Sequence, residues 1–520
     1  MSSWERTSKS YVSWLCNTDL RKEFAKNIRY QGLSLWWLNK LLDKDNLNET
    51  KWYEDLHHLL NKKKAKIIKK DKLFYIKFFI KFFKKFVAEI VFTVFVKIFF
   101  ESKNKNLTRK KNCFYAVLSN FVVFEDKFID RQYGLAGLKK TIKQMYFIEF
   151  TKNFRIITKY FDLKKKLKNI PFDFFISSHH LNVLDIIKIY WFSLKMFFLT
   201  IIILRKKNFF YINKINCKEI LKFKLLESFS GSVQDQLLKG LALEKGLSKT
   251  DCQNFINCFD FHPHSRPIYY FARQSKVKNI ISINHANYSE NNLFFNFNKK
   301  EFSENNGSPY FSPKPDIFFC QGKRYYKKLK KIFLREKIYN IGSLKIELNK
   351  FELKYYKIKK NRKRKKILLI LCSMNDYSSF VKLLNQCNLE NFNIIVAPHP
   401  LNKISTINYF EKNFKKEFLS NEKINRTKLL NSFDYIVFGD TSLGLEFAIK
   451  KYNIFRIYDK QFIPTFDIDK EIPTATNSKT ISKLLRKKNI PQKSSLIEKN
   501  YFFKYDKKAS YRFHKVIDNL

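Results

Sequence analysis

The sequence predicts an α/β protein with a parallel sheet that helices cover on both faces. Short apolar runs alternate with helix-compatible segments over residues 366–458, which is the pattern of such a sheet. The runs occupy 367–371, 394–397, 435–438 and 454–458, and three of them end in small or polar residues. Ligands of parallel sheets bind at the carboxyl ends of the strands, so this region predicts a ligand-binding domain.

Two of these strand ends carry side chains suited to binding a phosphate. Asp440, Thr441 and Ser442 follow the run 435–438, and the next residues, 443–451, predict a helix with Thr441 or Ser442 as its N-cap. The N-terminus of a helix favours phosphate. His399, which we expect one strand over, can add a hydrogen bond or a positive charge. The alternative is that these residues only shape an ordinary helix start and a His-Pro turn.

The same residues resemble the donor half of GT-B glycosyltransferases. The shared pattern is a His-Pro after one strand, then, about forty residues later, an Asp-Thr-Ser after another, with an acidic residue in the next helix. It is similar to that of capsule Kdo transferases, polysialyltransferases and teichoic-acid glycerophosphotransferases, which make bacterial surface carbohydrates. The resemblance implies two Rossmann-like domains facing a cleft, with a mostly helical N-terminal region. It also implies that His399, Pro400, Thr441 and Ser442 hold the donor phosphates and that Glu446 holds the ribose.

Further residues are assigned to the donor side because they end predicted strands or open the turns that follow. These are Gly322, Lys323, Gly342, Ser373 and Asp440.

A cluster of acidic and histidine residues over 260–285 predicts the catalytic base. Glycosyl transfer needs a group that deprotonates the acceptor hydroxyl, and Asp260, His262, His264 and His285 are of the right type. The alternative is a proline-rich turn with hydrogen-bonded histidines.

In the family pattern, an acidic residue with a nearby Pro and Arg and a later strand ending in a Gln-His pair lie in the acceptor half, and Asp260, Pro263, Arg266 and His285 match it. From the chemistry and the resemblance together we assign Asp260, His262 and His285 as catalytic residues and place Arg266 and Asn284 on the acceptor side. The sequence departs from the expected pattern at three positions, because Asp260, Asn284 and His264 stand where Glu, Gln and Trp are expected.

The composition is strongly basic, with 101 Lys and Arg against 46 Asp and Glu and a net charge of +55. Such a chain attracts nucleic acid, anionic lipid or anionic substrates, although codon drift in an A/T-rich genome also enriches lysine. The sequence has no zinc-finger spacing, RNP-like motif or strong helix-turn-helix signal, so we predict no nucleic-acid partner. Eight scattered cysteines without a CxxC pair, and no apolar signal core, indicate a cytoplasmic protein with reduced thiols.

A long amphipathic helix is predicted over 73–100, where lysines recur at helical spacing among Phe, Ile and Val. A basic run, 62–70, precedes it. Such a helix either lies on an anionic membrane surface or packs on the protein's own core. The apolar segment 186–204 leaves the same choice, and neither segment reaches the roughly 18 uncharged residues of a spanning helix.

The predicted organisation has six parts: a Trp-rich N-terminal region (1–60), a basic amphipathic helical region (61–170), a first Rossmann-like, acceptor-side domain (171–349), a basic linker (350–365), a second Rossmann-like, donor-side domain (366–475) and C-terminal helices (476–520).

The predicted function is that of a metal-independent glycosyltransferase on the inner face of the bacterial plasma membrane. It uses a nucleotide-sugar donor as substrate, needs no cofactor, and acts on a surface polysaccharide or lipid-linked glycan. The alternatives are a glycerophosphotransferase or nucleotide-sugar epimerase of the same fold, a basic nucleic-acid-binding protein, or a membrane-attached scaffold. Adjacent His179 and His180 would point to opposite faces of a strand, so no metal site is predicted there.

Overall fold

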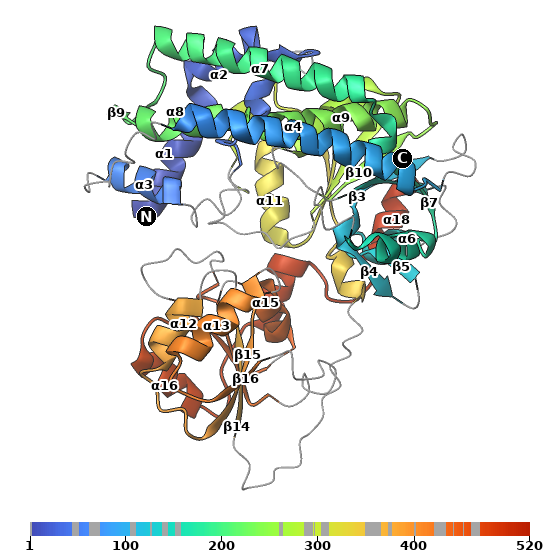
Figure 1. Ribbon diagram of the computed structural model, residues 1–520. Helices are drawn as coiled ribbons and strands as arrows, with labels where there is room; N and C mark the ends of the chain where they lie inside the picture. The colour runs from blue at the N-terminus through green and yellow to red at the C-terminus, as the bar shows by residue number, and fades with distance from the viewer. Residues whose placement is uncertain are drawn as a thin grey trace.

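The computed structural model describes residues 3–43, 51–61, 73–103, 111–124, 127–137, 144–150, 158–258, 264–284, 295, 297–302, 311–348, 366–372, 377–399, 402–420, 433–439, 441–450, 452–458 and 468–520. These residues form two α/β domains, each built around one parallel sheet. Figure 1 shows the first domain above and the second below.

The first domain contains a seven-stranded parallel sheet in the order β13-β12-β11-β10-β3-β6-β7. Numbered along the chain, this is the doubly wound order 7-6-5-4-1-2-3. Successive strands are added toward one edge from β3 and toward the other edge from β10, so the topological switch point lies between these two parallel strands. The strands are β3 (Asn112–Val117), β6 (Gln144–Glu149), β7 (Asp173–Ile176), β10 (Asn254–Asn257), β11 (Asn279–Ile283), β12 (Ile317–Cys320) and β13 (Lys337–Asn340).

This sheet begins earlier than the sequence predicted. Both β3 and β6 lie within 61–170, which was expected to be helical, so the start of the sheet moves from 171 to Asn112. Both strands are buried along almost their whole length. Fully buried strands lack the alternating pattern that separates a strand from a buried helix, which is the physical reason for the error.

The second domain contains a six-stranded parallel sheet in the order β16-β15-β14-β17-β18-β19. Numbered along the chain this is 3-2-1-4-5-6, with its switch point between β14 and β17. Its strands are β14 (Lys366–Leu371), β15 (Phe392–Ala397), β16 (Phe418–Ser420), β17 (Tyr435–Phe438), β18 (Ile454–Ile457) and β19 (Thr474–Ala475). The four apolar runs predicted as strands are therefore confirmed. The expectation that His399 lies one strand from Thr441 is wrong, because β14 separates β15 from β17.

Helices cover both sheets. Those of the first domain are α1 (Ser3–Asn17), α2 (Asp19–Asn27), α3 (Lys51–Leu60), α4 (Phe74–Phe99), α6 (Tyr160–Lys168), α7 (Val183–Lys206), α8 (Lys218–Glu227), α9 (Ser232–Leu247), α10 (Ser265–Gln274) and α11 (Lys323–Ile332). Those of the second are α12 (Tyr377–Leu384), α13 (Lys403–Asn413), α15 (Ser442–Ile449), α16 (Ser478–Arg486) and α17 (Ser494–Ile497).

Short elements complete the two domains: the 3-10 turns η1 (Leu35–Leu38), η4 (Leu118–Asn120), η5 (Gly134–Gly137), η6 (Ser177–His180), η8 (Lys299–Glu301) and η9 (Leu344–Leu348), and the hairpins β1 (Arg29–Tyr30) with β2 (Leu33–Ser34), β4 (Phe121–Phe124) with β5 (Lys127–Asp130), and β8 (Tyr211–Ile212) with β9 (Ile215–Asn216).

The Trp-rich N-terminal region is part of the first domain. Trp36 and Trp37 are almost completely buried, and Trp36 belongs to the same apolar core as Phe147 of β6 and Phe255 of β10. The aromatic residues of this region therefore form part of the hydrophobic core.

Two segments connect the domains. In η9, Leu344 packs in the core of the first domain, while Ile346 packs in the core of the second. Near the C-terminus, the π-helical turn η12 (Glu498–Phe502) lies in the second core, and α18 (Ala509–Ile517) returns to the first. Figure 1 shows α18 within the upper domain, far from the other C-terminal helices.

Candidate active site

The N-terminus of α15 stands next to the switch point of the second sheet. Thr441 is its N-cap, as predicted, and its side-chain oxygen accepts a hydrogen bond from the Leu443 backbone N–H at 3.4 Å. Gly444 allows the helix to approach β17, since a Cβ there would lie 2.1 Å from the Phe438 ring. The start of α15 is thus held tightly against the carboxyl end of β17, with Thr441 and Ser442 half-buried.

His399 lies beyond the end of β15, on the other side of β14. Its backbone carbonyl accepts a hydrogen bond from Asn402 N–H at 3.0 Å, which closes the turn before α13. The side chain is half-buried. Two strand spacings of about 4.8 Å place the β15 and β17 ends roughly 10 Å apart along this edge of the sheet.

The first domain adds two cations to this edge, Arg131 and Lys345. Arg131 follows β5, and Lys345 lies in η9 between the two core residues that join the domains. The two segments are packed tightly, because Gly134 approaches the Leu344 carbonyl so closely that a Cβ would lie 2.2 Å from it. Both cations are exposed.

The groups lie close enough to influence one another's charge. Burial, together with Arg131 and Lys345, lowers the pKa of His399. Lys345 is exposed overall, but the protein around its ammonium group removes part of its hydration, and this desolvation together with Arg131 lowers the pKa of Lys345. Charges from both domains therefore converge on His399, which is an arrangement that favours an anion.

Glu446 belongs to the same group. Burial raises the pKa of its carboxyl, and the opposite charges of Lys345 and Lys450 oppose that shift. The Tyr505 hydroxyl lies 3.4 Å from Oε2. Glu446 thus lies on the side of α15 that faces Lys345, one turn into the helix.

The predicted acceptor-side residue Arg266 binds other residues of the protein through its two terminal nitrogens. Its guanidinium lies 3.0 Å from the Glu301 carboxylate, contacts the Ser312 hydroxyl and stacks over Trp37 at 4.8 Å. The side chain is 1% exposed, so it holds the N-terminal region onto the first domain. Asn284 is also buried, and its backbone N–H donates to the Phe319 carbonyl at 2.8 Å.

Three predicted donor-side residues lie at the domain junction. A Cβ on Gly322 would lie 2.2 Å from the Asn500 carbonyl, and one on Gly342 would lie 3.0 Å from the Arg512 guanidinium. Lys323 lies close enough to Lys499 and Lys327 for these like charges to lower its pKa. All three thus contact the C-terminal segment that joins the domains.

The remaining predicted site residues lie outside the described residues. They are Asp260, His262, His285, Ser373, Pro400 and Asp440.

Arg131 and Lys345 were not predicted as site residues. Neither belongs to a recognisable motif, and only the contact between Gly134 and Leu344 brings them together. Over the described part of the chain, no three His, Cys, Asp or Glu side chains are grouped so that they could hold a metal ion.

Comparisons with known proteins give matches among solved structures alone. No protein-family model and no curated protein matches the chain. UDP-GlcNAc 2-epimerase from Neisseria meningitidis, bound to UDP-GlcNAc, is 10% identical, with 79% of this chain and 100% of that chain covered and a TM-score of 0.42. The wall teichoic acid polymerase TagF is 11% identical, with coverages of 85% and 97% and a TM-score of 0.35. The calicheamicin glycosyltransferase CalG4 is 8% identical, with coverages of 79% and 98% and a TM-score of 0.41.

The chain has a GT-B-like fold. Each of its two domains is built around a doubly wound parallel sheet, and both sheets are covered by helices. Arg131 and Lys345 of the first domain act electrostatically on His399, and Lys345 acts on Glu446, so the four groups lie near one another where the domains meet.

Proposed function

We propose that this protein is a glycosyltransferase that moves a sugar from a nucleotide-activated donor to a surface polysaccharide or lipid-linked glycan. The observation that carries the proposal is the convergence of His399 and the α15 N-terminus with Arg131 and Lys345 of the other domain. Three cationic or hydrogen-bonding side chains around a helix start suit the diphosphate of a nucleotide sugar.

The proposed roles follow the course of the reaction. The bond between the sugar carbon and the donor phosphate oxygen breaks, and a bond from the acceptor oxygen to that carbon forms. Negative charge increases on the departing phosphate, where Arg131, Lys345 and the N-terminus of α15 stabilise it. The acceptor proton passes to a base, for which we propose Asp260, His262 or His285. Because the side chains themselves supply the positive charge, we propose transfer without a metal ion.

His399 and Glu446 orient the donor in this scheme. The pKa of His399 is lowered in the free protein, and its ring N–H donates a hydrogen bond to a phosphate oxygen, which favours protonation of the ring. Glu446, one turn along α15, accepts a hydrogen bond from a ribose hydroxyl.

The test starts with a screen of nucleotides and nucleotide sugars for thermal stabilisation, followed by calorimetric titration of the best donor. Charge-assisted hydrogen bonds contribute on the order of 1.5–3 kcal/mol each. His399→Ala and Ser442→Ala should therefore weaken donor binding by roughly 10- to 100-fold. His58→Ala on α3 and Ser478→Ala at the start of α16 are matched controls and should bind normally. Wild-type affinity in both site variants would reject this phosphate site.

A further inference from the structure

Helices α4 and α7 expose long apolar stripes on their outer sides. On α4, the exposed apolar residues recur every three or four positions, at Ile76, Ile80, Phe83, Val87, Val91, Val94 and Ile98. On α7 they include Leu184, Ile187, Trp191, Phe198 and Ile202. Trp191 is 71% exposed, which is unusual for so large an apolar side chain.

The two helices lie side by side, so their stripes form one surface. Phe78 stacks on Phe197 with ring centroids 4.0 Å apart, and Phe82 lies 5.3 Å from Tyr190, which makes the pair antiparallel. On the outer seam, half-buried Phe79 and exposed Phe198 are 6.4 Å apart. Figure 1 shows the two helices running together along the top of the first domain. We call the outer side of this pair the α4–α7 face.

Positive charge borders the apolar stripes. The helices carry nine exposed cations: Lys77, Lys81, Lys84, Lys85, Lys97, Lys188, Lys195, Arg205 and Lys206. Their only acidic residues are Glu89, which is buried, and Asp185, which lies 2.6 Å from Lys245. The α4–α7 face therefore combines apolar and cationic side chains with no exposed carboxylate of its own.

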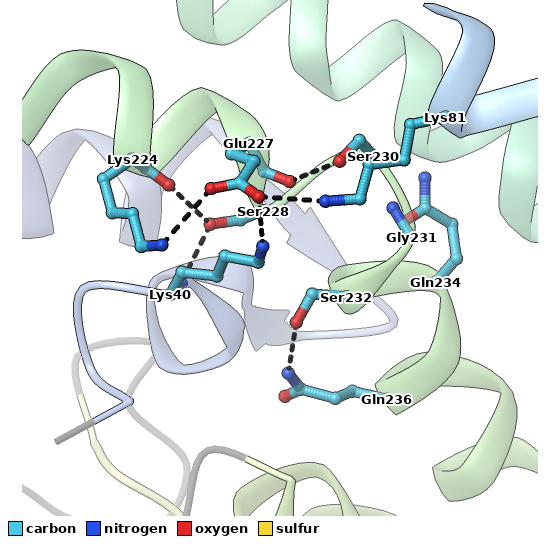
Figure 2. A network of polar contacts seen from close by, with 10 residues as sticks. All are labelled: Lys40, Lys81, Lys224, Glu227, Ser228, Ser230, Gly231, Ser232, Gln234 and Gln236. Atoms are coloured by element: carbon cyan, nitrogen blue, oxygen red, sulfur yellow. Dashed lines mark hydrogen bonds and ion pairs between the residues drawn. The ribbon is translucent and has the colours of Figure 1, made fainter. Parts of the chain in front are cut away.

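A polar network fixes α4 to the body of the first domain. Lys81 of α4, Lys40 and Lys224 surround the Glu227 carboxylate, with nitrogen–oxygen distances of 2.9, 2.6 and 3.3 Å (Figure 2). Burial alone would raise the pKa of Glu227, but the hydrogen bonds from Lys40 and Lys81 outweigh it and lower the pKa to about 2. The α4–α7 face is thus presented by a helix that stays attached to the fold.

The inner side of α7 is packed in the core of the first domain. Among the described residues, α7 is the one helix that has the length and composition to cross a membrane, yet 44% of its most apolar window is buried inside the protein. Phe197 and Met196, for example, lie in the first core. A helix with one side in a core and the other exposed is suited to lie along a surface.

We propose that the α4–α7 face docks flat on an anionic lipid bilayer. The charge pattern selects this occupant: apolar side chains enter the boundary between headgroups and acyl chains, while the bordering cations meet anionic headgroups. Exposed Trp191 suits the same interface. The α4 helix, about 39 Å long at 1.5 Å per residue, offers a footprint along the plane of the bilayer. The inference stands on these two helices and is independent of the glycosyltransferase assignment.

The test compares charge reversal on the face with equal charge reversal elsewhere. The face variant carries Lys84→Glu, Lys188→Glu and Lys195→Glu, and the control carries Lys479→Glu, Lys483→Glu and Lys488→Glu on the exposed surface of the second domain. Both lose the same net charge. In co-sedimentation with vesicles of phosphatidylglycerol and phosphatidylcholine at low salt, we expect the face variant to lose at least tenfold in binding and the control to bind nearly like wild type.

A second readout tests the apolar part. Trp191 fluorescence should shift to shorter wavelength when vesicles with phosphatidylglycerol are added, and the shift should disappear in Trp191→Phe. An Ile80→Ser, Phe198→Ser variant should bind more weakly even at low salt. Equal loss in the face variant and its charge-matched control would overturn the proposal, as would an unshifted Trp191 spectrum in bound protein. Binding of wild type to phosphatidylcholine alone, equal to that with phosphatidylglycerol, would overturn the role of the cations.

Discussion

The guanidinium of Arg324 on α11 lies 2.6 Å from the buried carboxylate of Glu471 in the second domain. Arg324 also donates to the Tyr501 hydroxyl at 2.5 Å and stacks over its ring. One side chain of the first domain thus holds two groups of the second, and the ion pair is part of the junction between them.

Loss of this pair should loosen the junction. Arg324→Ala leaves the Glu471 carboxylate buried without its main cation, and breaking a partly buried pair in this way costs about 1–3 kcal/mol. We expect a lower melting temperature. The double variant Arg324→Met, Glu471→Met should recover much of the loss, because neither charge is then stranded. A double variant less stable than either single variant would contradict the pairing.

Lys345 of the first domain should affect binding of a donor held mainly by the second. Lys345→Met removes a cation next to His399 and Glu446. We therefore expect the dissociation constant of the nucleotide sugar to rise roughly 10-fold. Arg131→Met should act in the same direction. Lys276→Met, an exposed lysine of the first domain, is the control. If calorimetry gives Lys345→Met the same donor affinity as this control, Lys345 does not belong to the donor site.

Donor binding should weaken as pH rises. Burial and the neighbouring cations lower the pKa of free His399 below its usual 6.5. A bound diphosphate favours the charged imidazole and raises that pKa, so binding takes up a proton at pH values between the two pKa values. Affinity should therefore be highest below this interval and fall as pH rises through it. His399→Gln should remove this part of the pH dependence, and an unchanged profile in that variant would assign the proton to another group.

Asp130 should make the stability of the folded protein depend on pH. Burial raises the pKa of its carboxyl from 3.8 to about 7. Between these values the folded protein keeps a proton that the unfolded chain releases, so this stability is present below about pH 4 and lost as pH rises through 7. Asp130→Asn should therefore raise the melting temperature at pH 8 and change it little at pH 4. Asn also accepts the Gln132 N–H bond, made at 2.7 Å. A destabilised Asp130→Asn at pH 8 would show that the charged carboxylate stabilises the fold, which contradicts a raised pKa.

Four of the six strands of the second sheet could be predicted from the sequence because they are apolar runs, most of which end in clear turn residues, such as the His-Pro after β15 and the Thr-Ser before α15. The short edge strands β16 and β19 were not predicted. The strands β3 and β6 of the first sheet do not end in such turn residues and are buried on both faces. Their apolar and aromatic residues suit a buried helix as well as a strand, so the local pattern is ambiguous.

The candidate site likewise combines residues that local sequence predicts with residues that only long-range packing brings together. Thr441 or Ser442 was predicted as the N-cap of α15 from local chemistry, and the structure has Thr441 in that position. Arg131 and Lys345 lie more than two hundred positions apart in the printed sequence, and only the close packing of Gly134 on Leu344 makes them neighbours. Arg266 was assigned to the acceptor because of a motif, yet Glu301 and Trp37 surround it in the core. Long-range packing decided both cases.

The return of α18 to the first domain affects the order in which the chain can fold during synthesis. Phe513 packs against Phe114 of β3 and Phe319 of β12, with ring centroids 6.3 and 5.1 Å apart. The six strands of the second sheet all lie earlier, between Lys366 and Ala475. On the ribosome, the part of the first sheet that α18 covers therefore stays exposed while the whole second sheet is made. The domain that starts first finishes last, and this exposed aromatic surface is available to a chaperone in the meantime.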